Sequence, residues 1–261
     1  MVGDLFTGTA VHYARHRPGY PTAFLTEVAR RFSLPGTGRL LDLGCGPGTL
    51  TIALAGQVHD AVGVDPEADM LAEAARQARL ARIRNIRWVE ARAENLPPDL
   101  GGFQFATMGR SFHWMDRDRV LTMLADMITP TGGLVIVNDN CLVRPATDWQ
   151  RAIEETQAKF LGTVRRAGSG VFAPPTEPHE TVLARSRFRQ AERIVYEFER
   201  QWTVEQIVGY LYSTSFPIRR LLGERRASFE EEIIEALRAY SPDGRFTEPV
   251  HLEAIFASLN I

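Results

Sequence analysis

The sequence predicts an α/β fold in which helices cover both faces of a doubly wound parallel sheet. Short apolar runs of strand length alternate with segments of helical periodicity from residue 39 to residue 139. Strands separated by helices are joined by right-handed crossovers and therefore lie parallel. A glycine-rich turn follows the first apolar run, and open sheets of this kind bind ligands beyond the carboxyl ends of their strands.

The elements of this core follow one another in a regular order. Five strands are expected, at 40–43, 61–65, 86–89, 103–108 and 134–137. Apolar residues at helical spacing predict helices at 49–55, at 67–80 and from Asp116 onward. An earlier helix is expected to begin near Pro21, because proline suits the first helical position, and the segment 131–133 is expected to be a turn before the fifth strand.

The second half of the chain has a different pattern, with a helix expected at 149–161 and a loop at 162–178. Alternating apolar residues predict half-buried strands at 193–201 and 250–256, the second behind Pro249, which favours a strand start or an edge. Two pairs have the spacing of capping boxes that open helices: Thr203 with Gln206, and Ser228 with Glu231. We expect the last two strands to extend the sheet and the helices between them to form a cap.

The expected organisation is one structural domain in three parts. Residues 1–38 form an N-terminal lid and helix, residues 39–141 the ligand-binding core, and residues 142–261 the remainder of the sheet with its cap. The cap insertions are expected at about 144–180 and 202–240.

Composition excludes several classes of protein. Hydrophobic residues are 44% and charged residues 24% of the 261 residues, which is typical of a globular chain. The net charge is -2, without the basic excess of a nucleic-acid binder. No apolar run has the length of a membrane span, and residues 1–6 lack the pattern of a secretion leader.

Cys45 and Cys141 are the only cysteines, too few for a disulfide framework, and the histidines have no metal-ligand spacing. We therefore expect a cytoplasmic protein with free thiols and no metal, acting on a small molecule. Neither nucleic acid nor a membrane is an expected partner, and the chain is expected to be a monomer or a homodimer.

The most informative segment is the turn that contains Gly44, Gly46 and Gly48. Glycine is needed where φ is positive or where the backbone approaches a ligand closely. Thr49 stands where a dinucleotide-binding GxGxxG turn would have its third glycine, and no P-loop lysine follows. The next strand ends at Asp65, whose carboxylate can accept both ribose hydroxyls of a nucleoside. A purely structural turn, and an Asp65 that only starts the next helix, are the alternatives.

These motifs and several others stand in the order found in class I S-adenosylmethionine-dependent methyltransferases, and the chain resembles their small-molecule branch, methyltransferase type 11. The resemblance rests on 41–49, Asp65, 93–97, 112–114 and 130–133, and on the terminal segments 6–21 and 243–249. It is weakest from about 142 to 185 and in the cap helices. The resemblance implies a Rossmann-like, seven-stranded methyltransferase sheet with five parallel strands and a C-terminal antiparallel pair. It also implies S-adenosylmethionine as cofactor and S-adenosylhomocysteine as product.

The resemblance assigns roles to individual residues. Asp42, Gly44 and Gly46 would line the methionine part of the cofactor, with the Asp42 carboxylate near its ammonium group. Asp65 would hold the ribose and Met70 would pack on the ribose or the adenine. The adenine edge would meet Ala93 and Glu94, although Arg92 stands where many relatives have an acidic residue. Arg110 and Ser111 would lie along the methionine moiety.

The candidate catalytic residue is His113, which follows the fourth strand and has an unperturbed pKa suited to proton transfer near neutrality. It is a base, a wall of the pocket or a residue of the core, and Trp114 lies beside it. Tyr13 and Arg17 precede the predicted first helix in a segment that could fold over the cofactor. The acceptor pocket is expected in the cap, near Trp149 and Tyr210, with Tyr210 on a different helix face from the apolar stripe.

The predicted activity is methyl transfer to oxygen, carbon or nitrogen of a small molecule by in-line displacement. An RNA methyltransferase and a cofactor-binding protein without transfer activity are the alternatives. A nicotinamide dehydrogenase is the weakest of them, because the glycine spacing differs.

Overall fold

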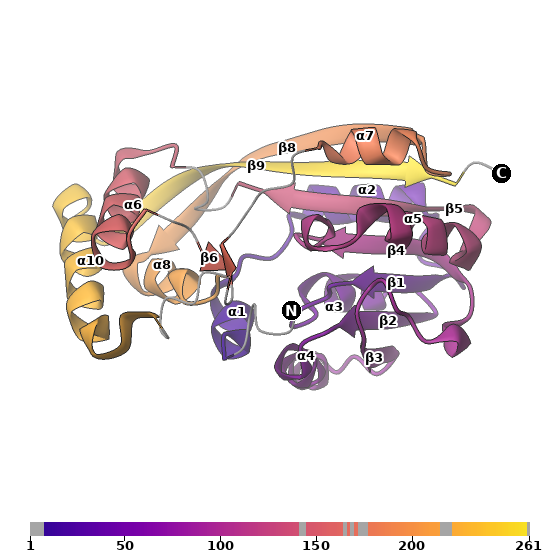
Figure 1. Cartoon of the computed structure of the whole chain (residues 1–261), viewed down its shortest axis with the longest axis horizontal. Helices are drawn as coiled ribbons and strands as arrows, with labels where there is room; N and C mark the ends of the chain where they lie inside the picture. The colour runs from indigo at the N-terminus through magenta and orange to yellow at the C-terminus, as the bar shows by residue number, and fades with distance from the viewer. Residues whose placement is uncertain are drawn as a thin grey trace. The chain divides into compact units, whose positions relative to one another are not determined.

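The computed structural model describes residues 8–140, 145–163, 166–167, 170–171, 177–214 and 221–259. Its main feature is a seven-stranded sheet in the order β3-β2-β1-β4-β5-β9-β8 (Figure 1). The strands are β1 (Arg39–Leu43), β2 (Asp60–Asp65), β3 (Ile86–Glu90), β4 (Phe103–Gly109), β5 (Ile128–Asp139), β8 (Gln190–Thr203) and β9 (Arg245–Ser258). β1 to β5 are parallel, β9 is antiparallel to β5, and the β8 and β9 arrows run in opposite directions. The predicted fold class is confirmed.

The described residues fall into two compact units. The first, which we call the sheet unit, is drawn from Gly19–Asp139, Pro174–Tyr196 and Leu252–Ile261. The second, the helical unit, is drawn from Met1–Pro18, Asn140–Ala173 and Glu197–His251. It also contains a two-stranded ladder, β6 (Arg166–Ala167) with β7 (Gly170–Val171). The predicted three-part division of the chain stays a prediction.

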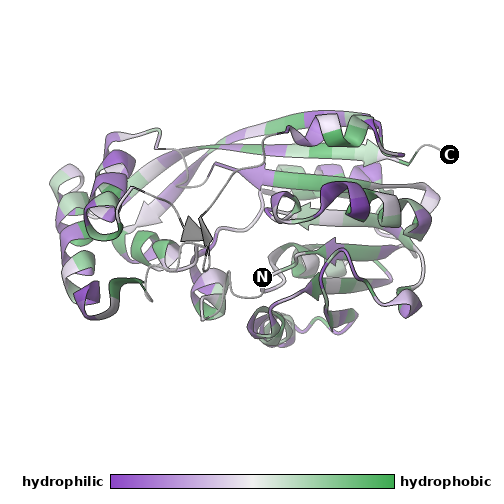
Figure 2. Cartoon of the chain, in the orientation of Figure 1, coloured by the Kyte–Doolittle hydropathy of each residue, from purple (hydrophilic) through white to green (hydrophobic). Residues whose placement is uncertain are grey.

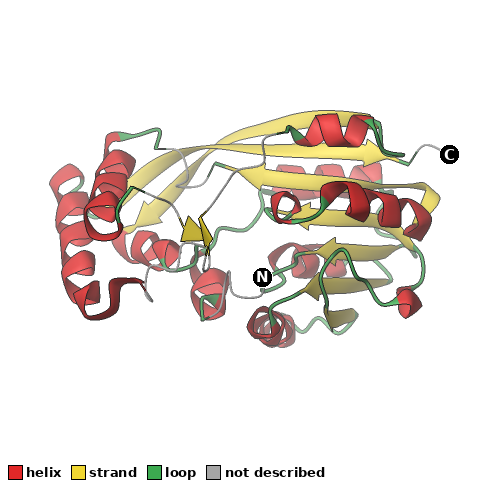
Figure 3. Ribbon diagram, in the orientation of Figure 1, coloured by secondary structure: helices red, strands yellow, loops and turns green. Residues whose placement is uncertain are grey.

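The strands of the sheet unit are apolar because both faces of the sheet are covered. Hydrophobic positions run along these strands in Figure 2, and every residue of β1 except Arg39 is buried. The covering helices are α2 (Thr22–Arg31), α3 (Thr49–Ala55), α4 (Ala68–Leu80), α5 (Arg117–Met127) and α7 (His179–Ala184) (Figure 3). Asp116 caps α5, since its carboxylate accepts a hydrogen bond from the Arg119 amide, as the predicted start of that helix requires.

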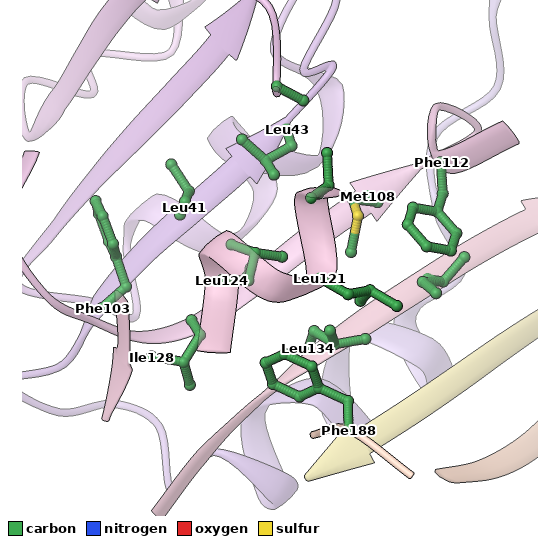
Figure 4. Close-up of a cluster of buried hydrophobic side chains, with 14 of the residues drawn as sticks. Leu41, Leu43, Phe103, Met108, Phe112, Leu121, Leu124, Ile128, Leu134 and Phe188 are labelled. Carbon is green, nitrogen blue, oxygen red and sulfur yellow. The ribbon is translucent and has the colours of Figure 1, made fainter. Parts of the chain in front are cut away.

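One face of the sheet carries the larger hydrophobic cluster (Figure 4). Leu41 and Leu43 of β1 pack there with Leu121 and Leu124 of α5, and all four side chains are fully buried. On β9, Ile255 belongs to this cluster, whereas the ring of its neighbour Phe256 contacts Phe24 of α2. Successive residues of β9 therefore serve the two faces in turn, as a covered strand requires.

The helical unit has its own core. Among the described residues it contains the helices α1 (Ala10–His16), α6 (Asp148–Leu161), α8 (Val204–Leu211) and α10 (Arg226–Tyr240). Aromatic side chains dominate the buried cluster, among them Trp149, Trp202, Tyr210 and Phe229. The Thr203–Gln206 capping box that opens α8 is confirmed. Within the part of the chain that the structure describes, no helix has the length and apolarity needed to cross a membrane.

Two predictions about helices are wrong. Tyr13 does not precede the first helix: it lies within α1, a helix that has little apolar periodicity. This helix packs through a histidine instead. Gly209 of α8 has no β-carbon, and the His16 ring lies only 2.4 Å from where a β-carbon at residue 209 would stand. Ser228 does not open α10 either, because that helix begins at Arg226 after a short 3-10 turn.

Two strand boundaries also differ from the prediction. Pro249 lies inside β9, whose pairing with β5 covers only Leu252 to Ser258. Proline lacks the N–H group that a strand donates to its neighbour. It is tolerated at this position because β5 already ends at Asp139 and requires no hydrogen bond from residue 249. The segment 131–133 is part of β5 and not a turn before it. Its register with β4 jumps between the pairs Phe103–Ile128 and Phe105–Gly133, so the extra residues form an irregularity inside the strand.

Candidate functional site

The glycine-rich turn lies between β1 and α3, at the carboxyl edge of the sheet. Gly44, Gly46 and Gly48 all have positive φ, of 65°, 54° and 79°. A β-carbon on Gly44 would come within 2.5 Å of the Ser111 β-carbon, so this glycine is required by packing. A β-carbon on Gly46 would meet no atom of the described residues within 4 Å, so among these residues the turn faces open space at Gly46. The turn is therefore packed on one side and accessible at Gly46.

Asp65, at the end of β2, connects the next helix to this turn. One carboxylate oxygen accepts a hydrogen bond from the Gly46 amide at 2.8 Å, and the other accepts from the Glu67 amide at 3.0 Å. Burial raises the pKa of Asp65 to about 6, although the two amide hydrogen bonds oppose the shift. Each carboxylate oxygen has a second lone pair, so Asp65 can accept further hydrogen bonds. Asp65 thus joins the Gly46 amide of the turn to the Glu67 amide just before α4, and its contact with a ribose stays a prediction.

Asp42 lies beneath the turn. Its two carboxylate oxygens accept hydrogen bonds from the hydroxyls of Thr51, at 2.5 Å, and Thr107, at 2.8 Å. Burial raises its pKa to about 6 against these hydrogen bonds. The neighbouring Cys45 thiol is also buried, and burial raises its pKa, which makes it a poor nucleophile. The structure therefore assigns Asp42 to a buried network that joins β1, α3 and β4.

The end of β4 is tied to the same turn. The Ser111 hydroxyl donates to the Leu43 carbonyl at 2.7 Å, which holds Ser111 against Gly44. Arg110 has a φ of 57° and donates two hydrogen bonds to Asp139, at 3.0 and 2.7 Å. Its guanidinium also lies 4.8 Å from the centre of the Tyr20 ring. Of the two residues predicted here, Ser111 reaches the turn, and the Arg110 side chain is held by Asp139.

Three predicted adenine-side residues come from α4 and the loop after β3. Met70 and Ala93 are buried. The Glu94 carboxylate accepts from the Asp116 amide at 2.9 Å and from Arg92 at 3.3 Å. Burial opposes ionisation of Glu94, but these hydrogen bonds and the Arg92 charge prevail and lower its pKa. Arg92 therefore acts on Glu94.

His113 lies in a single 3-10 turn, Phe112–Trp114, directly after the end of β4. Its ring centre is 4.8 Å from that of Trp114. Burial lowers the pKa of His113 to about 4, and the charges of His179 and Arg117 lower it further. His113 is therefore a neutral imidazole near neutral pH, which is the form that can accept a proton.

A second histidine, His179 at the start of α7, was not predicted. Arg117 lies 3.2 Å from its Nδ1 and donates to the Glu177 carbonyl at 2.8 Å. A guanidinium has no acceptor, so Nδ1 of His179 must accept and the ring proton lies on Nε2. A cavity of about 280 Å³ adjoins this ring, lined by Ile136, Asn138, Glu177, Pro178, His179, Glu180, Arg193, Glu253 and Ile255. No local sequence signal identifies His179, because its partners come from other elements.

Four predicted residues lie in the helical unit. The Arg17 guanidinium is 4.7 Å from the ring centres of both Tyr13 and Tyr210 and donates to the Ser213 hydroxyl at 3.0 Å. Tyr210 is only 1% exposed and packs in the same buried cluster as Ile207 and Leu211, which contradicts the expectation that it serves a pocket. Trp149 is also buried, and its indole N–H donates to the Thr247 carbonyl. The structure thus brings Tyr13, Arg17 and Tyr210 together and places Trp149 in the core.

No group of three or more histidine, cysteine, aspartate or glutamate side chains suited to a metal ion occurs among the described residues. The turn is surrounded by glycine backbone, two buried carboxylates and a serine, and the neutral imidazole of His113 follows two residues after that serine in the chain. Such a set can bind a polar ligand with hydroxyl groups and can accept a proton.

Comparisons of the sequence with known proteins find methyltransferases. Residues 40–132 match a family described as a methyltransferase domain. An uncharacterized methyltransferase of Mycobacterium tuberculosis is 27% identical over 217 residues, which cover 82% of this chain and 79% of that protein. An uncharacterized methyltransferase of Schizosaccharomyces pombe is 25% identical over 242 residues, 91% of this chain and 89% of that protein.

A solved structure shares the fold. A protein from Anaeromyxobacter dehalogenans, described as a candidate type II methyltransferase, superposes with a TM-score of 0.59 at 22% identity. The superposition covers 93% of this chain and 97% of that one.

Proposed function

Since the chain belongs to the class I S-adenosylmethionine-dependent methyltransferases, in the type 11-like group, we propose that it binds S-adenosylmethionine in the sheet unit. We further propose that it transfers the methyl group to oxygen, carbon or nitrogen of a small molecule. One observation carries the cofactor assignment. The Asp65 carboxylate and the Gly46 amide are joined at the carboxyl edge of the sheet, next to open space at Gly46.

These residues fit the chemistry of the cofactor. The ribose has two adjacent hydroxyls, and Asp65 keeps lone pairs able to accept from both while its own position is fixed by two amides. Gly46 and Ser111 would line the methionine part, and Met70, Ala93 and Glu94 the ribose and adenine side. Asp42 would support the turn from below through Thr51 and Thr107.

When bound, the cofactor supplies a methyl group already activated on a sulfonium, ready for in-line displacement by an acceptor. The contribution of this chain is then to align the acceptor and exclude water, which can supply roughly 7–11 kcal/mol. His113 would accept a proton from the acceptor, because burial keeps it neutral. Its low pKa makes it a weak base, so it suits an acceptor whose proton becomes acidic as the reaction proceeds.

The acceptor class is argued from charge. A net charge of -2 gives no general attraction for a nucleic-acid backbone, which favours a small molecule over RNA. Of the residues predicted for acceptor binding, Trp114 is the one proposed to line the acceptor site, because its ring centre lies 4.8 Å from that of His113. A cofactor-binding protein without transfer activity would keep the same turn and Asp65, so only an activity measurement separates it from an enzyme.

Transfer of labelled methyl groups from S-adenosylmethionine tests this function. Oxygen, nitrogen and carbon acceptors of small size are screened beside RNA, with the wild-type chain, His113→Gln and the exposed control His59→Gln. We expect transfer to a small molecule, lowered about 10²–10⁴-fold in His113→Gln and unchanged in His59→Gln. Transfer to RNA alone would contradict the acceptor class. Cofactor that binds but is never consumed would contradict the enzyme.

A further inference from the structure

β8 is the last strand in the order of the sheet, next to β9. An edge strand has a row of backbone N–H and C=O groups on its outer side that can pair with another strand. β8 is long, from Gln190 to Thr203, and mostly exposed or half-buried. Val195, near its middle, is a large apolar residue that is exposed, at 46%.

The central part of β8, residues 192–200, reads Glu-Arg-Ile-Val-Tyr-Glu-Phe-Glu-Arg. This segment is complementary to itself when it is reversed about Tyr196. We propose that two copies of this chain associate through β8, as antiparallel strands related by a two-fold axis at Tyr196. The two sheets would then join into one continuous sheet across the dimer.

The antiparallel arrangement places residues of opposite charge directly across from each other. Glu192 faces Arg200 of the partner subunit, and Arg193 faces Glu199 of the partner subunit. Ile194 faces Phe198 of the partner subunit, a β-branched and aromatic pair of the kind that stabilises sheets. The two-fold axis repeats each of these pairs once more.

Neighbouring registers are less favourable, which makes the register specific. A two-fold axis normal to the sheet places the same face of β8 on the same side in both subunits. The pairing of the two strands can therefore change only if the axis moves to an adjacent residue. An axis at Val195 keeps only one kind of charge pair, Arg193 with Glu197. An axis at Glu197 places two glutamates opposite each other, which is repulsive. Charged residues usually protect an edge strand, but here they favour the register about Tyr196, which has two kinds of opposite-charge pair, over its two neighbours.

The charges on β8 are already oriented by their own chain. Glu192 pairs with Arg31 at 2.6 Å, and Arg193 contacts Glu180 and, at 3.6 Å, Glu253. The Arg200 side chain is only 10% exposed and contacts Glu248. Because the Arg200 side chain is largely buried, the pair formed by Arg193 and Glu199 of the partner subunit is the better one to test. Glu199 is exposed, so it can be changed without disturbing the core.

Sedimentation equilibrium of the full chain provides the first test, with Arg193→Glu, Glu199→Arg and the double variant. The control is Glu155→Arg, which makes the same charge change as Glu199→Arg at an exposed position of α6. We expect a wild-type dimer, a dissociation constant raised about tenfold or more in each single variant, and recovery in the double variant. A monomeric wild type, or a dimer that both single variants leave unchanged, would overturn the proposal.

A cysteine at the axis tests the register. Residues directly opposite in antiparallel strands have Cα atoms about 4.5–5.5 Å apart, a separation that a disulfide spans. Tyr196→Cys should therefore form a covalent dimer on mild oxidation. Glu199→Cys, far from its own copy in this register, should not, nor should the wild-type chain with Cys45 and Cys141. Equal cross-linking of both variants, or no cross-linking of Tyr196→Cys, would contradict an axis at Tyr196. This result does not depend on whether the chain transfers methyl groups.

Discussion

Replacing Asp65 by asparagine tests the proposed cofactor site with a minimal change of shape. An asparagine oxygen can still accept from one of the two amides, Gly46 or Glu67, but its NH₂ group cannot accept from the other. The charged acceptor proposed for the ribose hydroxyls is lost as well. Hydrogen bonds to charged groups contribute about 1.5–3 kcal/mol, so the dissociation constant for S-adenosylhomocysteine should rise about 10- to 150-fold.

Calorimetric titration measures this effect, with Asp69→Asn as the matched control. Asp69 is an exposed carboxylate in the first turn of α4, only four residues along the chain, and its removal changes the net charge equally. Thermal melting checks that both variants fold. An unchanged dissociation constant in Asp65→Asn, or an equal loss in Asp69→Asn, would refute the ribose assignment.

The same carboxylate predicts a pH dependence. The ionised form of Asp65 accepts the ribose hydroxyls, and burial raises its pKa to about 6. The affinity of the wild-type chain for S-adenosylhomocysteine should therefore fall as the pH drops from neutrality through 6, because protonation removes the charged acceptor. Titrations in a series of buffers should show this fall in the wild type and a flatter profile in Asp65→Asn.

Three further predictions concern the residues around the site. His113 has a pKa of about 4 in the fold against 6.5 as a free side chain, so the unfolded state binds more protons between these values. As the pH falls from 6.5 to 4, the free energy of unfolding of the wild type should therefore fall by about 3 kcal/mol relative to that of His113→Gln, measured by urea unfolding. The same pH dependence of this free energy in both proteins would contradict the burial of His113. Asp139→Ala should lower the free energy of unfolding by about 3–5 kcal/mol, because it leaves the Arg110 guanidinium, 9% exposed, without its bidentate carboxylate. Gly44→Ala should destabilise the fold more than Gly46→Ala, since only the first places a β-carbon against Ser111, whereas Gly46→Ala should mainly weaken cofactor binding; equal melting temperatures would contradict this distinction.

The parts of the fold that local sequence determines were predictable. The turn at Gly44 to Gly48 needs positive φ at successive glycines, and the adjoining strands and helices have their periodicity within a few residues. The capping box at Thr203 is a similar local signal, because its hydrogen bonds join residues three apart. Asp65 at the end of its strand was found in the same way.

Features that depend on distant residues were not predictable. The helix α1 packs through His16 against Gly209, so its sequence shows no apolar stripe of its own. The tolerance of Pro249 inside β9 depends on where β5 ends, at Asp139. The burial of Tyr210 depends on contacts with Trp202, which lies on a strand. The partners of the candidate site, Ser111 with Leu43 and His179 with Arg117, also come from different elements.

Titration of the wild-type chain with S-adenosylmethionine, S-adenosylhomocysteine and NAD tests the central claim most directly. Asp65 and the turn at Gly46 should bind both sulfur nucleosides with micromolar dissociation constants and should not bind NAD, since Thr49 replaces the third glycine of a dinucleotide turn. Binding of NAD, or of neither sulfur nucleoside, would contradict the cofactor proposed for this site.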